Sequence, residues 1–442
     1  MQMHFAAKDG MLHGVIDVAG ENRMSTPEMD KAHSLVTRAR QGARVMSTAS
    51  SAQKNAALLR IRELLDENKA DLLEANAKDL AAGEEHGLGA AMLDRLKLSD
   101  SRLQSLKDAL ADIANAPDPV GAVSGLQTRP SGIQVGRMQV PLGVIMMIYE
   151  SRPNVTVDAA ALCLKAGNAI ILRGGKEAKH SNAALAALVQ QALRENDLDD
   201  GAAVLVDTPD RNVLYALLKQ SGIDLAIPRG GTSLIDAVNE HARVPVLQHY
   251  QGICHVVVDA AADLDMAERI VVNAKTQRPG VCNAMEGLVV DAAVADAFIP
   301  RITTALKDKG VRMYGCERTR ALADDVEAAT PEHFDTEFLD LACAIQVVDD
   351  YDAALAFVAA HGTQHTETIV TNDHTRAMHF TRAVDASCVM VNASTRFNDG
   401  GELGLGAELG ISTTKLHAYG PMGLDELCTK KFVVLGHGEV RG

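Results

Sequence analysis

A single cysteine in a tight turn is the residue of this chain best placed to do chemistry. Cys282 comes two residues after the helix-breaking pair Pro279-Gly280, and the apolar run at 287–290 predicts a strand directly behind it. Such a loop presents a thiol to a cleft, where the thiolate is a strong nucleophile once its pKa is lowered. A free cysteine is more often a buried packing residue, so the rest of the chain has to decide between the two roles.

A glycine turn upstream of Cys282 has the composition of a phosphate-binding loop. Gly174-Gly175 lies between Arg173 and Lys176 at the end of a predicted strand. Paired glycines allow a ligand to approach the backbone, and the two cations attract phosphate. The chain has no GxGxxG fingerprint followed by an acidic ribose-binding residue. Cations in place of that acid favour NADP over NAD.

A second turn of this type leads from a predicted strand into a predicted helix. Its glycines and hydroxyl residues lie where the free N–H groups of the first helical turn favour an anion, and we expect them to bind the cofactor: Gly230, Gly231, Thr232 and Ser233. Each turn alone is compatible with an ordinary strand exit. Two of them in one α/β series indicate a nucleotide site.

Two other patterns do not support a binding site. The glycine-rich stretch at 404–410 resembles a dinucleotide motif, but it follows Asn398-Asp399 and no strand, so we expect a flexible loop over the active site. Four histidines lie close together in the sequence. His361 ends a predicted helix and His365 begins a predicted strand, so the spacing needed for two helical metal ligands is missing and no metal is predicted.

The elements around these residues predict an α/β fold. Helical periodicity is found from residue 28 to about 81 and again from 101 to 114, and a hairpin follows with strands at 126–129 and 133–140. Strands and helices then alternate from 141 to 247, and a second such series follows Cys254. Repeated βαβ units with apolar strands indicate parallel sheets covered by helices. A last strand is predicted at 431–435.

The predicted organisation is therefore two parallel-sheet α/β domains plus a β-ribbon. The NADP-binding domain is assigned 28–125 and 141–256, the catalytic domain 257–423, and the ribbon 126–140 and 424–442. Residues 1–27 show no clear period and are expected to form a loose extension. A ribbon placed between such units is more often an interface arm than a core sheet.

Composition sets the class and the compartment. The chain has 442 residues, 47% hydrophobic, and a net charge of −15, which argues against nucleic-acid or anionic-membrane partners. Its seven cysteines are widely spaced, without a C-x-x-C pair, as expected in a reducing compartment. No signal-type segment or membrane-length apolar run is present, so a cytoplasmic location is expected.

Several long motifs together carry a family resemblance. From about residue 28 to the end, the chain resembles gamma-glutamyl phosphate reductases, of the aldehyde dehydrogenase superfamily. The matching stretches are 140–144, 149–156 (Tyr-Glu-Ser-Arg-Pro-Asn-Val-Thr), 167–175, 278–284 (Arg-Pro-Gly-Val-Cys-Asn-Ala), 361–367, 392–397 and 416–421. The resemblance implies an aldehyde-dehydrogenase-like fold with a cofactor domain, a catalytic domain and an oligomerisation ribbon.

The resemblance also implies a reaction and a nucleophile. An acyl phosphate is reduced by NADPH to an aldehyde in proline biosynthesis, with Cys282 forming a thioester intermediate. The tetrahedral oxyanion needs hydrogen-bond donors, and these are the Cys282 backbone N–H and the side chain of Asn154 or Asn283. For the substrate, Arg152 and Arg396 suit its anionic groups, Glu150 its ammonium, and His365 the same cleft. The alternative for each is a structural contact.

One substitution separates two reactions on this scaffold. Hydrolytic aldehyde dehydrogenases carry a water-activating glutamate, and the matching region here has Gln248, with no acidic residue from 242 to 258. Glutamine cannot act as a base, which favours the reductive enzyme over an oxidative aldehyde dehydrogenase. A non-catalytic nucleotide-binding protein is disfavoured because Cys282 and both phosphate-type turns occur together. We expect a homo-oligomer and a transient contact with glutamate 5-kinase.

Overall fold

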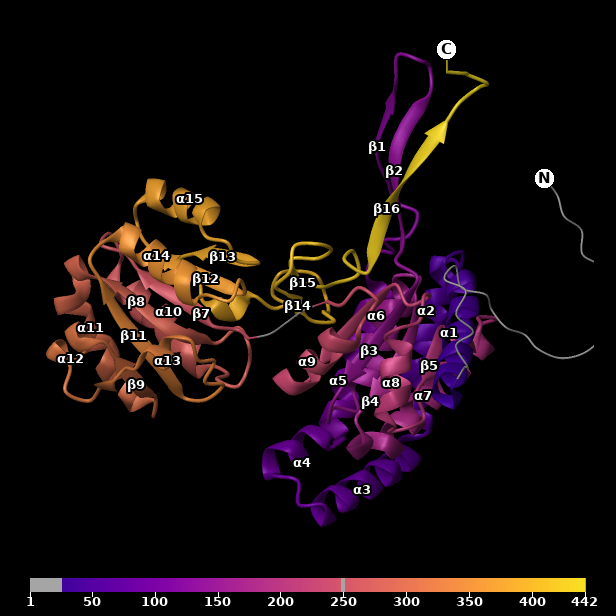
Figure 1. Ribbon diagram of the computed structural model, residues 1–442, viewed down its shortest axis with the longest axis horizontal. Helices are drawn as coiled ribbons and strands as arrows, with labels where there is room; N and C mark the ends of the chain where they lie inside the picture. The colour runs from indigo at the N-terminus through magenta and orange to yellow at the C-terminus, as the bar shows by residue number, and fades with distance from the viewer. Residues whose placement is uncertain (1–25, 248–250, 442) are drawn as a thin grey trace, which may run out of the picture.

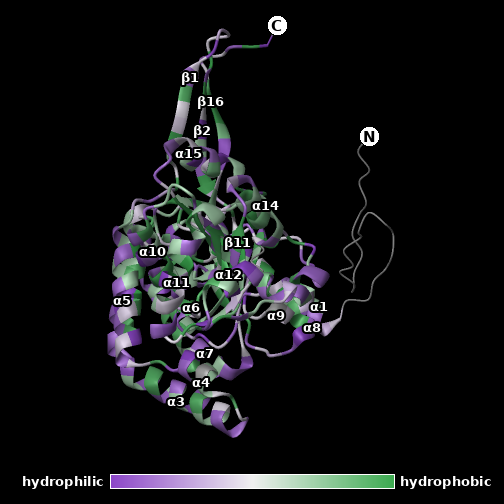
Figure 2. Ribbon diagram, turned by 90° about the vertical axis from the view of Figure 1, so that its left-hand side faces the viewer, coloured by the Kyte–Doolittle hydropathy of each residue, from purple (hydrophilic) through white to green (hydrophobic). Residues whose placement is uncertain are grey.

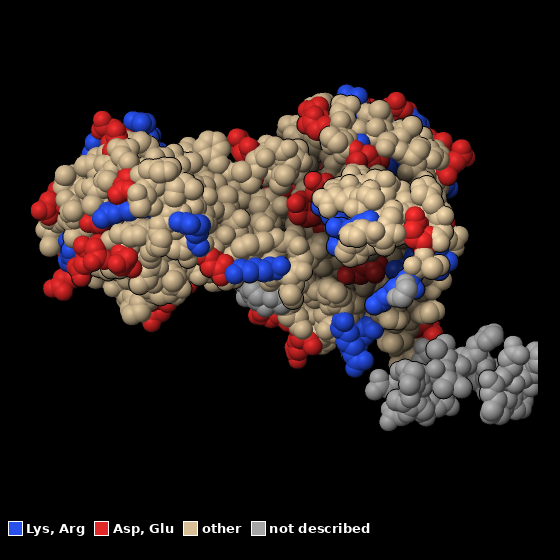
Figure 3. Space-filling model, turned by 90° about the horizontal axis from the view of Figure 1, so that it is seen from above, with Lys and Arg blue, Asp and Glu red and all other residues tan. Residues whose placement is uncertain are grey.

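The computed structural model describes residues 26–247 and 251–441. Two α/β lobes lie side by side, and a long ribbon projects from the lobe that holds the N-terminal helices (Figure 1). Seen from above, a narrower waist joins the lobes, and acidic and basic side chains are interspersed over that face (Figure 3). The parallel sheets and their helix layers confirm the predicted fold class.

The first lobe is built on a four-stranded parallel sheet in the order β5-β4-β3-β6. Every residue of its central strand β3 is buried. In the registers, Tyr149 pairs with Gly174 on one side and with Arg229 on the other, so the carboxyl ends meet at one edge. The strands are β3 Val144–Tyr149, β4 Ala169–Gly174, β5 Ala203–Leu205 and β6 Leu225–Arg229.

Helices cover this sheet, and the first five precede it in the chain. Apolar residues spaced along α2, such as Leu58, Ile61 and Leu65, are buried in the core of this lobe, as their spacing predicts. The helices are α1 Pro27–Met46, α2 Ser51–Glu67, α3 Lys69–Glu85, α4 Ala90–Leu96, α5 Asp100–Asn115, α6 Val155–Lys165, α7 Lys179–Glu195, α8 Arg211–Leu217 and α9 Thr232–His241, with short 3-10 turns η1 Lys176–Ala178 and η2 Asp200–Ala202.

The second lobe holds a seven-stranded parallel sheet in the order β10-β9-β11-β8-β7-β12-β13. Separate apolar clusters fill its two faces, one under α10 and α11 and the other under α14 and α15. Figure 2 looks onto this lobe and shows hydrophobic colouring along the central strands. The strands are β7 Cys254–Val258, β8 Met285–Asp291, β9 Arg312–Gly315, β10 Glu327–Ala328, β11 Ala342–Val348, β12 Thr366–Val370 and β13 Cys388–Val391. The helices are α10 Leu264–Thr276, α11 Ala292–Asp308, α12 Glu317–Leu322, α13 Pro331–Phe334, α14 Tyr351–His361 and α15 His374–Ala383, with the 3-10 turn η3 Thr395–Phe397.

The ribbon is a three-stranded antiparallel sheet of β1 Val123–Thr128, β2 Gln134–Pro141 and β16 Cys428–Leu435. β16 pairs with β2 over its whole length, so the last strand of the chain joins the early hairpin. A two-stranded piece, β14 Ile411–Ser412 with β15 Gly420–Pro421, lies between the lobes (Figure 1). The antiparallel hairpin and its pairing with the last strand were predicted from the sequence.

Several sequence predictions need correction. The strand expected at 245–247 is only an isolated bridge between Ala226 and Val246, because a single residue pairs there. β7 begins at Cys254 and pairs wholly within the seven-stranded sheet, so a division after residue 256 would cut a strand. β1 begins at Val123, before the assigned start of the ribbon. β9 and β10 were not predicted. The expected extension falls mostly on residues 1–25, which lie outside the described residues.

Within the described part of the chain, no helix combines the length and the apolar character needed to cross a membrane.

Candidate functional site

The Cys282 turn lies at the amino end of β8, as the sequence predicts. The N–H of Ala284 donates to the carbonyl of Val281 at 3.0 Å, which closes a tight turn directly before the strand. The Asn283 side chain donates to the Asn398 carbonyl at 2.9 Å and ties this turn to the start of the glycine-rich stretch. A side chain at Gly252 would place its first carbon 2.1 Å from the Cys282 carbonyl oxygen. Only glycine at 252 lets the two segments pack this closely.

A chain of buried polar groups supports the turn from behind. The thiol of Cys254 donates to the Cys282 carbonyl oxygen at 3.2 Å, and its sulfur lies 3.5 Å from Nδ1 of His365. That nitrogen also contacts the Thr366 hydroxyl at 2.7 Å. His365 is fully buried, so in this arrangement its ring faces the turn from inside the protein and not the cleft.

Burial dominates the electrostatics of the nucleophile. Although Cys282 keeps some solvent exposure, the protein atoms around it disfavour the thiolate and raise the pKa of the thiol to about 11. The guanidinium of Arg229 opposes this shift, whereas the carboxylates of Glu337 and Glu408 add to it. Burial also raises the pKa of both glutamates. Activation of Cys282 therefore requires added positive charge or a proton acceptor.

The first phosphate-type turn keeps its cations but not its open backbone. A side chain at Gly174 would meet the Asn182 amide, and one at Gly175 would meet the Glu177 carboxylate. These glycines make room for the chain's own side chains. Arg173 donates to the Pro209 carbonyl at 3.0 Å, and its buried Nε has no partner among the described residues. Lys176 is exposed.

The second turn is open at Gly231 but not at Gly230, where a side chain would meet the Glu150 carboxylate. No described atom lies within 4 Å of the position a side chain would take at Gly231. No side chain caps the N-terminus of α9, and Glu150 accepts a hydrogen bond from the Gly231 N–H at 3.1 Å. Ser233 is exposed beside it. A phosphate fits this helix start once the Glu150 carboxylate leaves the Gly231 N–H, because two anions there would repel each other. Glu150, expected at the substrate ammonium, lies at this turn.

Asn154 precedes α6, and a half-buried carboxylate holds its side-chain amide. Its Nδ2 donates to Oδ2 of Asp158 at 2.9 Å, one helical turn further along. Burial raises the pKa of Asp158 to about 6, and the hydrogen bond from Asn154 partly offsets this. The carboxylate fixes which end of the amide faces Asp158. One N–H of the same amide stays free to bind an oxyanion.

The two arginines expected at the substrate have different surroundings. Arg396 donates a hydrogen bond through Nε to the side chain of Gln277 at 2.8 Å. Gln277 directly precedes Arg278, where the nucleophile turn begins. Arg152 is exposed, and its side chain makes no hydrogen bond or ion pair with a described residue; partial desolvation and then nearby arginines lower its pKa. Gln248 lies outside the described residues, so its place relative to Cys282 is not described.

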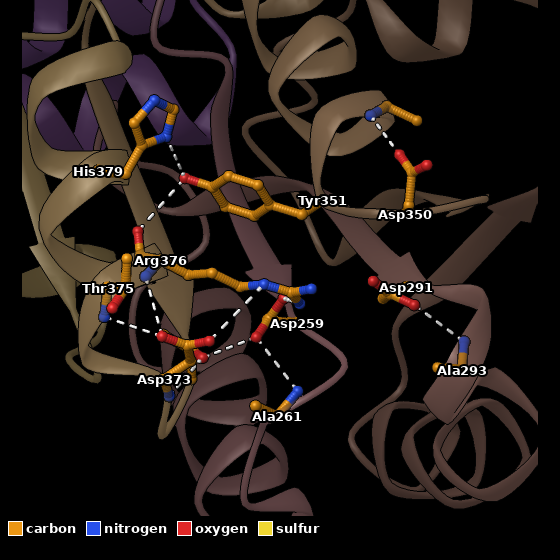
Figure 4. A network of polar contacts seen from close by, with 12 residues as sticks. Asp259, Ala261, Asp291, Ala293, Asp350, Tyr351, Asp373, Thr375, Arg376 and His379 are labelled. Atoms are coloured by element: carbon orange, nitrogen blue, oxygen red, sulfur yellow. Dashed lines mark hydrogen bonds and ion pairs between the residues drawn. The ribbon is translucent and has the colours of Figure 1, made fainter.

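The opposite edge of the seven-stranded sheet carries a different kind of polar cluster. Asp259, directly after β7, is buried and accepts hydrogen bonds from the Thr371 hydroxyl at 2.7 Å and from Arg376 at 2.5 Å (Figure 4). The Tyr351 hydroxyl lies 2.9 Å from Nδ1 of His379 in the same network. The Asp259 carboxylate is fully engaged, as in a structural tie between loops.

Sequence reasoning missed several charged groups that act on the residues of the candidate site. Glu337 comes from the segment before β11, and Arg95 from α4 in the first lobe. Glu408 belongs to the glycine-rich stretch, and Arg229 to the second turn, both of which the sequence singles out. No local pattern marks Glu337 or Arg95, because only the tertiary fold brings them to the site.

Comparison with known proteins identifies the family to which this chain belongs. The aldehyde dehydrogenase family model matches residues 18–313. A gamma-glutamyl phosphate reductase of Geotalea daltonii is 52% identical over 413 residues, covering 93% of this chain and 99% of the relative. One from Moorella thermoacetica is 53% identical over 405 residues, covering 91% and 97%. The crystal structure of the gamma-glutamyl phosphate reductase of Thermotoga maritima matches with a TM-score of 0.92 and 42% identity, over 93% of this chain and all of that one. The chain therefore belongs to the gamma-glutamyl phosphate reductases, within the aldehyde dehydrogenase family.

Proposed function

We propose that this chain reduces L-glutamyl 5-phosphate with NADPH to L-glutamate 5-semialdehyde and phosphate, the second step of proline biosynthesis from glutamate. The observation that carries the proposal is the tight turn that places Cys282 directly before β8, where the guanidinium groups of Arg229 and Arg396 act on its thiol. A nucleophilic thiol with guanidinium groups beside it suits an anionic acyl donor.

Cys282 is the nucleophile in this proposal. Its sulfur forms a bond to the acyl carbon, and the carbon–oxygen bond to phosphate breaks with its electron pair leaving on phosphate. Because the thiol pKa is about 11 in the free chain, the thiolate must form with help from the site. Arg229 stabilises the thiolate, and the carboxylates of Glu337 and Glu408, whose pKa burial raises, are the proposed proton acceptors.

The oxyanion is held by donors on both sides of the cleft. The Cys282 backbone N–H is one donor, and the free N–H of the Asn154 amide is the other. Removing one such donor costs roughly 3 kcal/mol in comparable acyl transfers. Asp158 keeps the Asn154 amide turned so that nitrogen, not oxygen, can face the charge.

NADPH supplies the hydride that converts the thioester to the aldehyde. The residues of both turns fit this cofactor: the open space beside Gly231, the uncapped start of α9, and the cations Arg173 and Lys176. Arg173 is the better placed of the two cations for the 2′-phosphate, because its buried Nε lacks a partner among the described residues. Thr232 and Ser233 supply backbone N–H groups of the first helical turn.

Substrate positioning is assigned to groups around the nucleophile turn. Arg396 lies within electrostatic reach of Cys282 and is proposed to pair with the α-carboxylate. Glu150 remains the proposed partner of the ammonium, which requires it to leave the Gly231 N–H. His365 is proposed to position Cys282 through Cys254 rather than touch substrate, since its ring is buried.

The ribbon is proposed to join two or more copies of the chain. Its outer strand β16 exposes Phe432 by 67% and Val434 by 55%, and Figure 2 shows hydrophobic stretches on this projecting sheet. Arg137 of β2 stacks over the Phe432 ring at 4.4 Å. Exposed apolar residues on a ribbon with free edges fit pairing with a second copy.

The seven cysteines are all unpaired, which supports the proposed cytoplasmic location. Contact with glutamate 5-kinase stays a prediction.

The test uses the reverse reaction, in which NADP oxidises glutamate semialdehyde in the presence of inorganic phosphate. The unsubstituted chain is expected to need phosphate, and Cys282→Ala is expected to lose at least about 10⁴-fold in kcat. NADP affinity, measured by calorimetry, should stay within about twofold because the cofactor turns are unchanged. The matched control is Cys388→Ala, a cysteine on β13 outside the turn, which should keep full activity. Retained turnover without Cys282, or equal rates with and without phosphate, would contradict the proposal.

A further inference from the structure

A fully buried ion pair flanks the nucleophile turn in the chain. Lys275, in the last turn of α10, places Nζ 2.7 Å from Oε2 of Glu286, the second residue of β8. The two side chains are 0% and 1% exposed. The pair joins positions 11 residues apart, and Cys282 lies between them, so it closes the segment that carries the nucleophile.

The surroundings of this ion pair are apolar. Ala274, next to Lys275, and Met285, next to Glu286, belong to the apolar cluster under α10 and α11. Burial raises the pKa of Glu286, although Lys275 opposes the shift. Apolar residues of similar size in place of a buried ion pair often leave stability unchanged or raise it. Stability therefore does not explain why two charged side chains are buried here.

The strand β8 is irregular at the same residue. Cys254 of β7 pairs with Met285. The next residue of β7, His255, pairs with Gly287, so Glu286 is an extra residue without a partner in the β7 ladder. Such bulges are rare between parallel strands, and bulges beside active sites re-aim a side chain. Here the bulged residue is the acid of the buried ion pair.

The bulge is linked to the nucleophile turn by a hydrogen bond. Cys254, where the register changes, donates its thiol hydrogen to the Cys282 carbonyl oxygen at 3.2 Å. If the bulge relaxed to regular pairing, the start of β8 would move by up to one residue, about 3.3 Å. A displacement of about 1 Å can cost on the order of 100-fold in rate. The register at the start of β8 therefore has to be fixed for Cys282 to stay in place.

We propose that Lys275 and Glu286 are positioning residues for the nucleophile: their ion pair holds the bulge at the start of β8, and the bulge fixes where Cys282 lies. The inference rests on the proposed function and adds two residues that touch neither substrate nor cofactor. Apolar contacts are not directional and tolerate sliding. A buried ion pair between a helix end and a strand specifies a single register.

The test sets kcat against stability in two variants. Lys275→Met combined with Glu286→Leu replaces the pair by apolar side chains, so the melting temperature should stay the same or rise. The nucleophile turn loses its anchor, and kcat of the reverse reaction should fall at least about tenfold, with the KM for NADP within about twofold.

The second variant, Glu286→Gln, should show the opposite pattern. It keeps the shape of the side chain and an oxygen that can accept a hydrogen bond from Lys275. Its melting temperature should fall, because Lys275 is left buried without a counter-charge. Its kcat, measured well below that temperature, should stay within about threefold, because the link to α10 is kept.

Another buried ion pair of the chain serves as the matched control. Lys54 of α2 lies 2.6 Å from Asp118 in the first lobe, and the two side chains are 0% and 12% exposed. Lys54→Met combined with Asp118→Leu removes this pair in the same way. Its kcat should stay within about twofold, because the pair does not bracket the nucleophile turn.

A further measurement follows the thiol itself. Iodoacetamide alkylates Cys282 without needing oxyanion donors, and peptide mass spectrometry can follow that cysteine at a series of pH values. If the ion pair acts through position, the pH midpoint of alkylation should be the same in the double variant and in the unsubstituted chain. A shifted midpoint together with the loss of kcat would make the pair a source of charge for the thiol and contradict the inference.

The remaining outcomes separate this inference from its basis. If kcat follows the melting temperature through all the variants, the pair is structural and the inference is wrong. If the double variant does not fold, Glu286→Asp carries the same prediction of lower kcat with an unchanged alkylation midpoint, since it keeps the charge but shortens the reach. An unsubstituted chain that reacts equally well without phosphate would contradict the proposed function itself.

Discussion

The two edges of the seven-stranded sheet differ in how well their polar groups are satisfied. At the carboxyl edge, Asp259 is bonded to Thr371, Arg376 and the Ala261 N–H (Figure 4). At the amino edge, around Cys282, four buried side-chain oxygens have no partner in the described residues: Asn283 Oδ1, Glu286 Oε1, Thr395 Oγ1 and Asn398 Oδ1. Satisfied polar groups hold a fold together, whereas unsatisfied ones are kept where a ligand or a reaction uses them.

This difference reverses the usual expectation for a parallel sheet. Ligands of open α/β sheets bind at the carboxyl ends of the strands. The first lobe follows that rule, since Arg152, Arg173 and Arg229 all lie at the carboxyl edge of its sheet. The second lobe turns its amino edge to the cleft and uses the carboxyl edge for a structural network. The site thus lies between two unlike edges.

Gly252→Ala is the substitution expected to disturb the nucleophile turn most without changing a reacting group. The added carbon would lie 2.1 Å from the Cys282 carbonyl oxygen, so the nucleophile turn must move. A displacement of about 1 Å costs on the order of 100-fold in rate, and we expect at least that loss in kcat. Gly89→Ala is the control, because nothing lies within 4 Å of its added carbon. Unchanged kcat in Gly252→Ala would show that the packing of this turn is not needed.

A smaller loss of kcat is expected for Asp158, because its carboxylate only orients the Asn154 amide that binds the oxyanion. Asp158→Asn should lower kcat about tenfold, less than loss of the Asn154 donor itself. Since the pKa of Asp158 is about 6, its carboxylate is present above that pH and lost below it. The kcat of the unsubstituted chain should therefore fall as pH drops through about 6.

A pH profile of kcat distinguishes this role from a structural one. The acid limb should be absent from Asp158→Asn, which no longer titrates there. An identical acid limb in both proteins would assign it to another group.

At the carboxyl edge of the seven-stranded sheet, a substitution is expected to lower stability and to leave activity unchanged. Asp259→Asn leaves Arg376 without its buried partner and should lower the free energy of unfolding by about 1–3 kcal/mol. Because this edge faces away from Cys282, kcat and KM should stay within about twofold. Denaturant unfolding and steady-state kinetics on the same preparation measure both quantities. A loss of kcat with normal stability would remove the distinction between the edges.

Local pattern predicted the nucleophile and the framework but not the charges around it. The Pro-Gly turn, the strand behind it and the hairpin have signals within a few residues, and the structure has all three. β9 was missed because Arg312–Gly315 is short and lacks an apolar run. The electrostatic effect of Glu337 on Cys282 depends on how distant segments fold together, for which the sequence holds no periodic signal.

The cofactor turns show a second limit. Gly174 and Gly175 looked like backbone made open for a ligand, yet Asn182 and Glu177 fill the space beside them. Gly231, in a similar pattern, is open. A glycine pair predicts a tight turn, but whether a ligand or a side chain occupies the space depends on residues elsewhere in the fold.

The central claim is that the amino edge of the seven-stranded sheet, where several buried oxygens lack hydrogen-bond partners among the described residues, supports a thioester on Cys282. Mixing the chain with NADP and glutamate semialdehyde in the absence of phosphate should give a burst of about one NADPH per chain. Rapid acid quenching, followed by peptide mass spectrometry, should then find the acyl group on Cys282. No burst, or an acyl group on any other residue, would contradict the account.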